Sequence, residues 1–178
     1  MDDKQKGAYD IQAVLLEMRE KYWQGLAEAE ETPEEQLECL TFDLGGETFA
    51  FETVHAAEVI RIPRLVKIPK VQAHFVGVFN LRGVITAAVD IRSLLNLPQL
   101  PLSASARIVV VKSEGFLTGL LTETVREVAA LSASSLEHAV QSLSGGQRDF
   151  IRGQLSLNGA MVRLLDIQKL MAAPELRI

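Results

Sequence analysis

FVGVFNLRGVITAAVDIR, at residues 75–92, is the stretch of sequence that decides the fold. Two short apolar runs lie on either side of Arg82-Gly83. Such runs are typical of β-strands, and a glycine-containing pair of residues between them favours a hairpin. Asp90-Ile91 follows the second run, where a short helical turn is expected. The stretch therefore predicts a β-hairpin that ends in a helical turn.

The same unit recurs 76 residues later in the chain, which indicates an internal repeat. Six residues of the first copy meet identical residues of the second: Gly77, Leu81, Gly83, Asp90, Ile91 and Leu94 correspond to Gly153, Leu157, Gly159, Asp166, Ile167 and Leu170. A shorter echo precedes each copy, with Glu58-Val59 before the first and Glu127-Val128 before the second. One copy alone is too small to bury much core. The repeat therefore predicts two five-stranded barrels that pack through a fixed, apolar interface.

The rest of the body is also predicted to be mostly β. Apolar and polar residues alternate over residues 40–44 and 49–51, on either side of Gly45-Gly46. The further strands expected are Val76–Leu81, Val84–Ile91, Arg107–Lys112, Phe116–Glu123, Val125–Ala130, Ile151–Leu157 and Met161–Leu165. Short strands at this regular spacing favour barrels or a sandwich.

An amphipathic helix is expected before the body, at residues 10–27. Its apolar residues recur at helical spacing: Ile11, Val14, Leu15, Met18, Tyr22 and Leu26. Two interpretations of this apolar stripe stay open, since it either packs on the body or is reserved for a partner. Thr32-Pro33-Glu34-Glu35 predicts a short turn or helix that leads into the first strand.

Charge divides the chain unevenly. Residues 1–40 contain 4 Lys and Arg against 11 Asp and Glu, whereas residues 41–178 contain 14 against 12. A nearly neutral body behind an acidic leader lacks the basic field that phosphate binding needs, so nucleic acid is not expected as a partner. The single cysteine, Cys39, excludes an internal disulfide. No apolar run approaches a membrane span and no signal stretch opens the chain, so a cytoplasmic protein without direct membrane insertion is expected.

A search for catalytic chemistry finds no complete constellation. Leu143-Ser144-Gly145-Gly146-Gln147 matches the signature of ABC-type ATPases, but the chain has no phosphate-binding G-x-x-x-x-G-K-[ST] loop, so a Ser/Gly turn is expected there. The three histidines, His55, His74 and His138, have no metal-ligand spacing. His55 and Glu58 are expected at neighbouring helical positions as a surface contact. Cys39 is expected to fill space in a strand. We therefore expect no enzyme, no cofactor and no metal.

The turn at Arg82 is the least conventional feature of the repeat. In the second copy Asn158-Gly159 suits a two-residue hairpin, because both residues adopt positive φ readily. Arginine fits positive φ less well, so either the first turn differs or Arg82 is present for what its side chain contacts. We hypothesise an ion pair between Arg82 and Glu58 that orients a surface for a partner; an ordinary surface arginine is the alternative.

Residues 75–85 together with Val89-Asp90-Ile91-Arg92 resemble the signature of the CheW-like domain. Ala57-Glu58-Val59, Gly119-Leu120-Leu121 and Leu165-Asp166-Ile167 fall where that family has similar elements, and the resemblance covers residues 38–172. It implies two five-stranded SH3-like barrels in tandem. It also implies a non-enzymatic adaptor that couples chemoreceptors to a sensor histidine kinase at membrane-associated arrays. One barrel would dock to the regulatory domain of the kinase, and a groove between the barrels would receive the cytoplasmic tip of the receptor.

The resemblance also implies which residues bind partners. Glu58 and Arg82 match family positions tied to receptor and kinase coupling, and the same surface would include Ala56, Val59, Asn80 and Gly83. The expected organisation is an acidic helical extension at 1–36, the CheW-like domain at 37–173 and a tail at 174–178.

The chain departs from the family pattern in three places. Ala87 stands where the family often has proline, Glu123-Thr124-Val125 replaces an Asp-Gly-Val run, and the acidic leader is additional. An alternative function therefore stays open: a CheW-like module that sequesters or relocates another signalling component, as in an array that controls surface motility.

Overall fold

The computed structural model describes residues 16–21, 23, 35–138, 143 and 145–176. The chain divides into two compact units, residues 1–35 and 36–178. In the first unit, residues 16–21 and 23 are helical, and Lys21 Nζ lies 3.1 Å from Glu17 Oε1 one turn away. These residues fall within the expected helix. The rest of that helix and the turn predicted at residues 32–34 lie outside the described residues.

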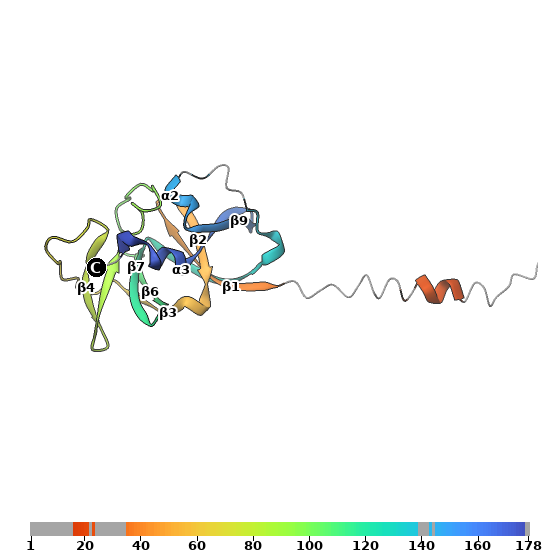
Figure 1. Ribbon diagram of the computed structural model, residues 1–178, viewed down its shortest axis with the longest axis horizontal. Coiled ribbons are helices and arrows are strands. Elements are labelled where there is room, and N and C mark those ends of the chain that lie inside the picture. Colours follow the sequence, from red (N-terminus) through yellow and green to blue (C-terminus); the bar gives the residue numbers. More distant parts are fainter. Residues whose placement is uncertain (1–15, 22, 24–34, 139–142, 144, 177–178) are drawn as a thin grey trace, which may run out of the picture. The chain divides into compact units, whose positions relative to one another are not determined.

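The second unit is built from two five-stranded sheets (Figure 1). The first sheet has the order β8-β1-β2-β10-β9, with β1 Gln36–Leu44, β2 Glu47–Glu52, β8 Thr124–Ser132, β9 Ile151–Leu157 and β10 Ala160–Leu165. The second has the order β3-β6-β7-β5-β4, with β3 Ala56–Arg61, β4 Phe75–Leu81, β5 Val84–Val89, β6 Arg107–Ser113 and β7 Phe116–Thr122. The prediction of a mostly β body with two five-stranded units is confirmed.

Short helices occupy several connections between the strands: η1 Thr53–His55, η2 Ala133–Ser135, α2 Gly145–Arg148, α3 Ile167–Ala172 and η3 Pro174–Leu176. Asp166 caps α3, because its Oδ1 accepts a hydrogen bond from Lys169 N at 3.0 Å. The turn expected over residues 143–147 is instead the single helical turn of α2. Gly146 allows it to pack closely, since a Cβ there would lie 2.8 Å from the Leu94 carbonyl oxygen.

The repeat in the sequence corresponds to a structural repeat. A shift of 76 residues carries β4 onto β9 and β5 onto β10 with the same bounds. The pairs β5–β7 and β10–β2 are both parallel. The shorter repeated segments, Glu58-Val59 and Glu127-Val128, also occupy equivalent positions. Val59 pairs with Val109 and Val128 pairs with Leu40, at matching registers of the two sheets.

Each sheet is closed by one bridging residue that pairs with its outer strand. Val66 pairs with Val78 on β4, and Glu137 pairs with Gln154 on β9. A Cβ on Gly77 would lie 2.7 Å from the Val66 carbonyl oxygen, and a Cβ on Gly153 would lie 2.8 Å from that of Glu137. The repeated glycine therefore lets the bridging segment approach the strand.

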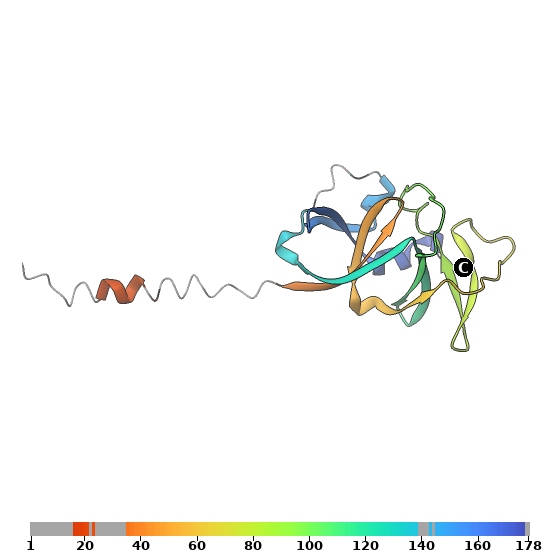
Figure 2. The same ribbon diagram turned by 180° about the vertical axis from the view of Figure 1, so that it is seen from behind.

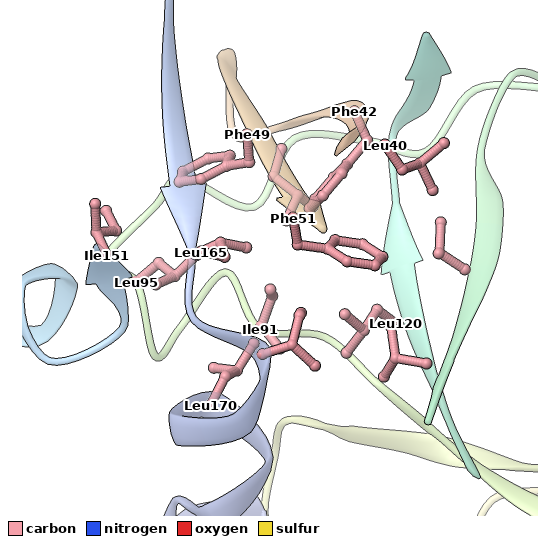
Figure 3. Close-up of a cluster of buried hydrophobic side chains, with 14 of the residues drawn as sticks. Leu40, Phe42, Phe49, Phe51, Ile91, Leu95, Leu120, Ile151, Leu165 and Leu170 are labelled. Atoms are coloured by element: carbon pink, nitrogen blue, oxygen red, sulfur yellow. The ribbon is translucent and has the colours of Figure 1, made fainter. Parts of the chain in front are cut away.

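The two sheets share a large apolar core (Figure 3). Phe51 from β2, Leu120 from β7 and Leu170 from α3 are fully buried and converge there with Ile91. Each sheet also has a smaller cluster, around Leu164 in the first and Ile108 in the second. The expected apolar interface between two small units is present, and it fixes one sheet against the other.

The prediction that His55 and Glu58 occupy neighbouring helical positions is wrong. The helical turn η1 ends at His55, and β3 begins at Ala56. Burial alternates along β3, with Glu58 half-buried and Val59 exposed. Two alanines give little local preference, and pairing with β6 decides the conformation.

Cys39 fills space in the first sheet, as predicted. Its side chain is fully buried in the smaller cluster of that sheet. Burial, assisted by the nearby Glu52 carboxylate, raises the pKa of the Cys39 thiol to about 11. The thiol is therefore protonated at neutral pH, which suits a structural residue.

Candidate functional site

The turn between β4 and β5 has the same conformation as its counterpart between β9 and β10. Arg82 and Gly83 have φ of 51° and 92°, and Asn158 and Gly159 have φ of 51° and 79°. Positive φ at both central residues is the pattern of a type I′ turn. Asn80 stabilises the first turn, because its Oδ1 accepts a hydrogen bond from Gly83 N at 2.6 Å. Arg82 therefore adopts a conformation that asparagine adopts more easily, without a change of turn type.

Arg82 forms the hypothesised ion pair with Glu58. Its Nη2 lies 2.9 Å from Glu58 Oε2. The pair links β3 and the β4–β5 turn, which lie at opposite ends of the strand order of the second sheet. The Arg82 side chain is 82% exposed and that of Glu58 25%. An ion pair this exposed contributes little stability, so a role at the surface explains it better than a role in folding.

The other predicted site residues separate into two groups. Val59, Asn80 and Gly83 are exposed, and Asn80 and Gly83 belong to the turn that holds Arg82. Ala56 is half-buried and packs against the shared core. We call the half-buried Glu58 and the exposed Val59, Asn80, Arg82 and Gly83 together the hairpin surface. The β4–β5 hairpin that carries most of it projects from the second sheet (Figure 2).

An apolar groove of about 630 Å³ adjoins the same hairpin. It lies between the second sheet and the C-terminal helices, and its lining includes Val78, Ile85, Phe116, Met171 and Leu176. Ile85 is 70% exposed and Phe116 is 76% exposed. The parallel register of β5 and β7 places these two residues at the same level. Large apolar side chains at the surface beside a groove are typical of a protein-binding site.

Sequence reasoning did not single out Phe116 or Met171. Apolar residues in strands and short helices are usually assigned to the core, and only the strand register shows that Phe116 is exposed. The one available signal was the turn Glu114-Gly115 just before Phe116.

A buried ion-pair network around Arg92 lies beyond the other end of β5 from the Arg82 turn. Arg92 is 5% exposed; its Nη2 lies 2.8 Å from Asp90 Oδ2, and its Nη1 lies 2.9 Å from Glu123 Oε1. The hydrogen bond to Asp90, opposed by burial, raises the pKa of the Arg92 guanidinium. Glu123 Oε1 also accepts from Gly45 N at 3.0 Å. Because Arg92 follows β5 and Gly45 follows β1, the network ties the two sheets together.

The network gives a structural reason for Glu123, one of the departures from the family pattern. Its carboxylate serves both Arg92 and the turn between β1 and β2. From the sequence, this position was only a departure from the family pattern.

The placement of titratable side chains in the described part of the chain bears on metal binding. No group of three or more His, Cys, Asp or Glu side chains there is placed to hold a metal ion. Within the same residues, no helix is long and apolar enough to cross a membrane.

Comparison with known proteins decides the family. The sequence model of the CheW-like domain matches residues 38–175. The chain belongs to the CheW-like domain family. Its curated relatives include the chemotaxis protein CheW of Treponema pallidum (strain Nichols), which is 24% identical over 148 residues that cover 81% of this chain and 87% of the relative. They also include the protein PilI of Pseudomonas aeruginosa (strain PAO1), 26% identical over 112 residues, or 63% of each chain.

The fold of this CheW-like chain is also that of a solved structure. The scaffolding protein TtCheW from Thermoanaerobacter tengcongensis superposes with a TM-score of 0.70 at 22% identity, over 79% of this chain and 96% of the other. At this identity the superposition establishes the shared fold.

Proposed function

We propose that this protein is a non-enzymatic adaptor that couples chemoreceptors to a sensor histidine kinase in chemotaxis-type signalling. The observation that carries the proposal is the Arg82–Glu58 pair, at 2.9 Å on a turn where arginine is conformationally unfavourable. Family membership supports it, because curated relatives are named chemotaxis proteins.

The adaptor works by holding two partner surfaces in one orientation. The shared core and the Arg92 network keep the two sheets in a fixed arrangement. The hairpin surface binds the regulatory domain of the kinase, and the Arg82–Glu58 pair fixes its geometry. The cytoplasmic tip of the receptor, a helical hairpin, docks in a groove of the body. The complex assembles in the cytoplasm, at membrane-associated receptor arrays.

Calorimetric titration tests the kinase contact. The full chain is titrated with the regulatory domain of a sensor histidine kinase from the same genome, and saturable binding of about micromolar affinity or tighter is expected. Glu58→Ala should weaken binding by about tenfold or more while the melting temperature stays the same, since the pair is exposed.

Arg126→Ala is the matched control. It removes a second exposed arginine–carboxylate pair, Arg126 Nε with Asp43 Oδ1 at 2.7 Å, from the first sheet. It should leave kinase binding unchanged. Equal losses in the two variants would remove the hairpin surface from the proposal.

A second function is favoured by the acidic leader and by the relative PilI, whose name does not describe it as a chemotaxis protein. In this alternative the chain sequesters or relocates another signalling component. A chain that binds a receptor tip but none of the kinase regulatory domains in the titration would support it.

A further inference from the structure

Five basic residues, on β3, on β6 and on the loop that leads from β3 to β4, have no part in the proposed function. We define the basic surface as Arg61, Arg64, Lys67, Lys70 and Arg107. The first four are exposed and Arg107 is half-buried. Between Val59 and Val89 the chain contains no Asp or Glu. The segment between Val59 and Val89, which contains four of the five basic residues, therefore has no acidic residue to balance their charge.

The basic surface also lacks counter-charges in space. Five other arginines of the body each pair with a carboxylate, whereas Arg148 donates to the Leu143 carbonyl oxygen: the five are Arg82, Arg92, Arg126, Arg152 and Arg163. Among the residues that the structure describes, no carboxylate lies within ion-pair distance of the five residues of the basic surface. The charges therefore remain available to a ligand.

Two of these arginines face each other directly. Arg61 on β3 and Arg107 on β6 are register partners in an antiparallel pair. Like charges at such positions destabilise a sheet unless an anion lies between them. Arg107 is held in place, because its Nη1 donates to the carbonyl oxygens of Ala104 at 2.9 Å and Ala106 at 2.8 Å.

A hollow of about 450 Å³ lies between the two arginines. Ile62, Ser103, Ala104 and Ala106 complete its lining. A carboxylate that enters it meets two guanidinium groups, and guanidinium groups bind carboxylates with two parallel hydrogen bonds. The hollow therefore has the chemistry of an anion-binding pocket.

Exposed apolar residues are interleaved with the basic ones. Val66 is 58% exposed and Ile68 38%. Val66 is fixed by its two backbone hydrogen bonds to Val78, at 2.9 Å and 2.8 Å, so this part of the loop is held against β4. Apolar groups add nothing to phosphate binding, whereas they bind the side chains of a polypeptide. The mixture favours an acidic polypeptide over a nucleic acid, and the vesicle experiment below separates it from a lipid surface.

We propose that the basic surface, centred on the hollow between Arg61 and Arg107, is a docking site for an acidic polypeptide segment of a partner protein that also carries apolar residues. Carboxylates of that segment occupy the hollow and contact Arg64, Lys67 and Lys70, and its apolar residues cover Val66 and Ile68. The site is separate from the hairpin surface and does not depend on the adaptor function.

Fluorescence anisotropy of the full chain tests the site. The probes are a fluorescein-labelled peptide of mixed Glu and Leu and a poly-glutamate peptide of the same length. The Glu/Leu peptide should bind saturably and more tightly than poly-glutamate, and high salt should weaken both, because the interaction is partly electrostatic. Arg64→Glu combined with Lys67→Glu should weaken binding by about tenfold or more, since two attractive contacts become repulsive.

A matched control separates the site from net charge. Lys112→Glu combined with Lys169→Glu changes the net charge by the same amount at two exposed positions elsewhere. This control should bind the peptide like the wild type, and circular dichroism melts should show that both double variants are folded. Equal weakening in the two variants would overturn the proposal.

Binding of other ligands to the basic surface gives further results that would overturn the proposal. Tighter binding of duplex DNA or of phosphatidylglycerol vesicles than of the Glu/Leu peptide would assign the surface to phosphate. Concentration-dependent self-association that disappears in Arg64→Glu/Lys67→Glu would assign it to a second copy of this chain. The same double variant should still bind the kinase regulatory domain, so failure here is distinguishable from failure of the adaptor proposal.

Discussion

The two hairpins of the repeat have the same fold and different surfaces. β4–β5 and β9–β10 share their bounds after the shift of 76 residues, and both turns have positive φ at their two central residues. A glutamate lies at the matching place of the strand at the opposite end of each sheet, Glu58 in β3 and Glu127 in β8. The turn residue differs, since Arg82 pairs with Glu58 whereas Asn158 occupies the equivalent turn. The two hairpins therefore share one backbone structure. Arg82, which the turn does not require, distinguishes the candidate site from its counterpart.

The largest expected difference in the free energy of unfolding is between substitutions of Arg92 and Gln168, the equivalent residues that follow the two hairpins. Arg92 is buried with Asp90 and Glu123, whereas its counterpart Gln168 is exposed on α3. Arg92→Ala leaves two carboxylates without their partner and should lower the free energy of unfolding by about 3 to 5 kcal/mol. Gln168→Ala should change it by less than about 0.5 kcal/mol. Urea unfolding of both variants measures the difference, and similar values would refute the structural role of the network.

A smaller effect is expected in both halves, and it should be larger for Gly77→Ala, because Gly77 has a φ of 154° that L residues rarely adopt and Gly153 does not. Gly77→Ala and Gly153→Ala each place a Cβ within 2.8 Å of a backbone carbonyl oxygen or closer. Each substitution should destabilise the protein by about 1 to 3 kcal/mol, because the bridging segment must move away. Thermal melts of the two variants check this. A loss in only one of them would show that the two closures are not equivalent.

A pH-dependent effect should arise in the first sheet alone. Cys39 matches Ile108 of the second sheet by register, and only the cysteine titrates. Its pKa rises from 9.0 to about 11 in the fold, so the protonated thiol stabilises the native state below pH 9 and this contribution is lost as the pH rises from 9 to 11. Urea unfolding at several pH values should show a steeper loss of stability over this window in the wild type than in Cys39→Ala. Parallel curves would assign the loss to other groups.

The smallest effect on stability comes from exchange of the turn residues. Arg82→Asn should change the free energy of unfolding by less than about 0.5 kcal/mol, since an easier φ offsets the loss of an exposed pair. Asn158→Arg should destabilise slightly, because the arginine must adopt positive φ. Calorimetric melts measure both. A large loss of stability in Arg82→Asn would make the Arg82–Glu58 pair structural.

The sequence predicted the features that local chemistry controls. The hairpins, the repeat and the capped turn at Asp166 follow from glycine, asparagine and aspartate at fixed positions, and the Arg82–Glu58 pair followed from one residue that fits its turn badly. β3 was missed because Ala56-Ala57 has no strand preference and its alternation appears only against β6.

Long-range contacts account for the other omissions. The Arg92 network joins Arg92 to Glu123, 31 positions away, and Glu123 to Gly45, 78 positions away. The facing of Arg61 and Arg107 depends on strand register, which no local pattern shows.

The central claim is that the hairpin surface binds a partner and that its counterpart in the repeat does not. Calorimetric titration of the kinase regulatory domain into Arg82→Asn and Asn158→Arg tests it most directly. We predict that Arg82→Asn weakens binding by about tenfold or more without unfolding the chain, and that Asn158→Arg binds like the wild type. Unchanged affinity in Arg82→Asn, or an equal loss in Asn158→Arg, would contradict the claim.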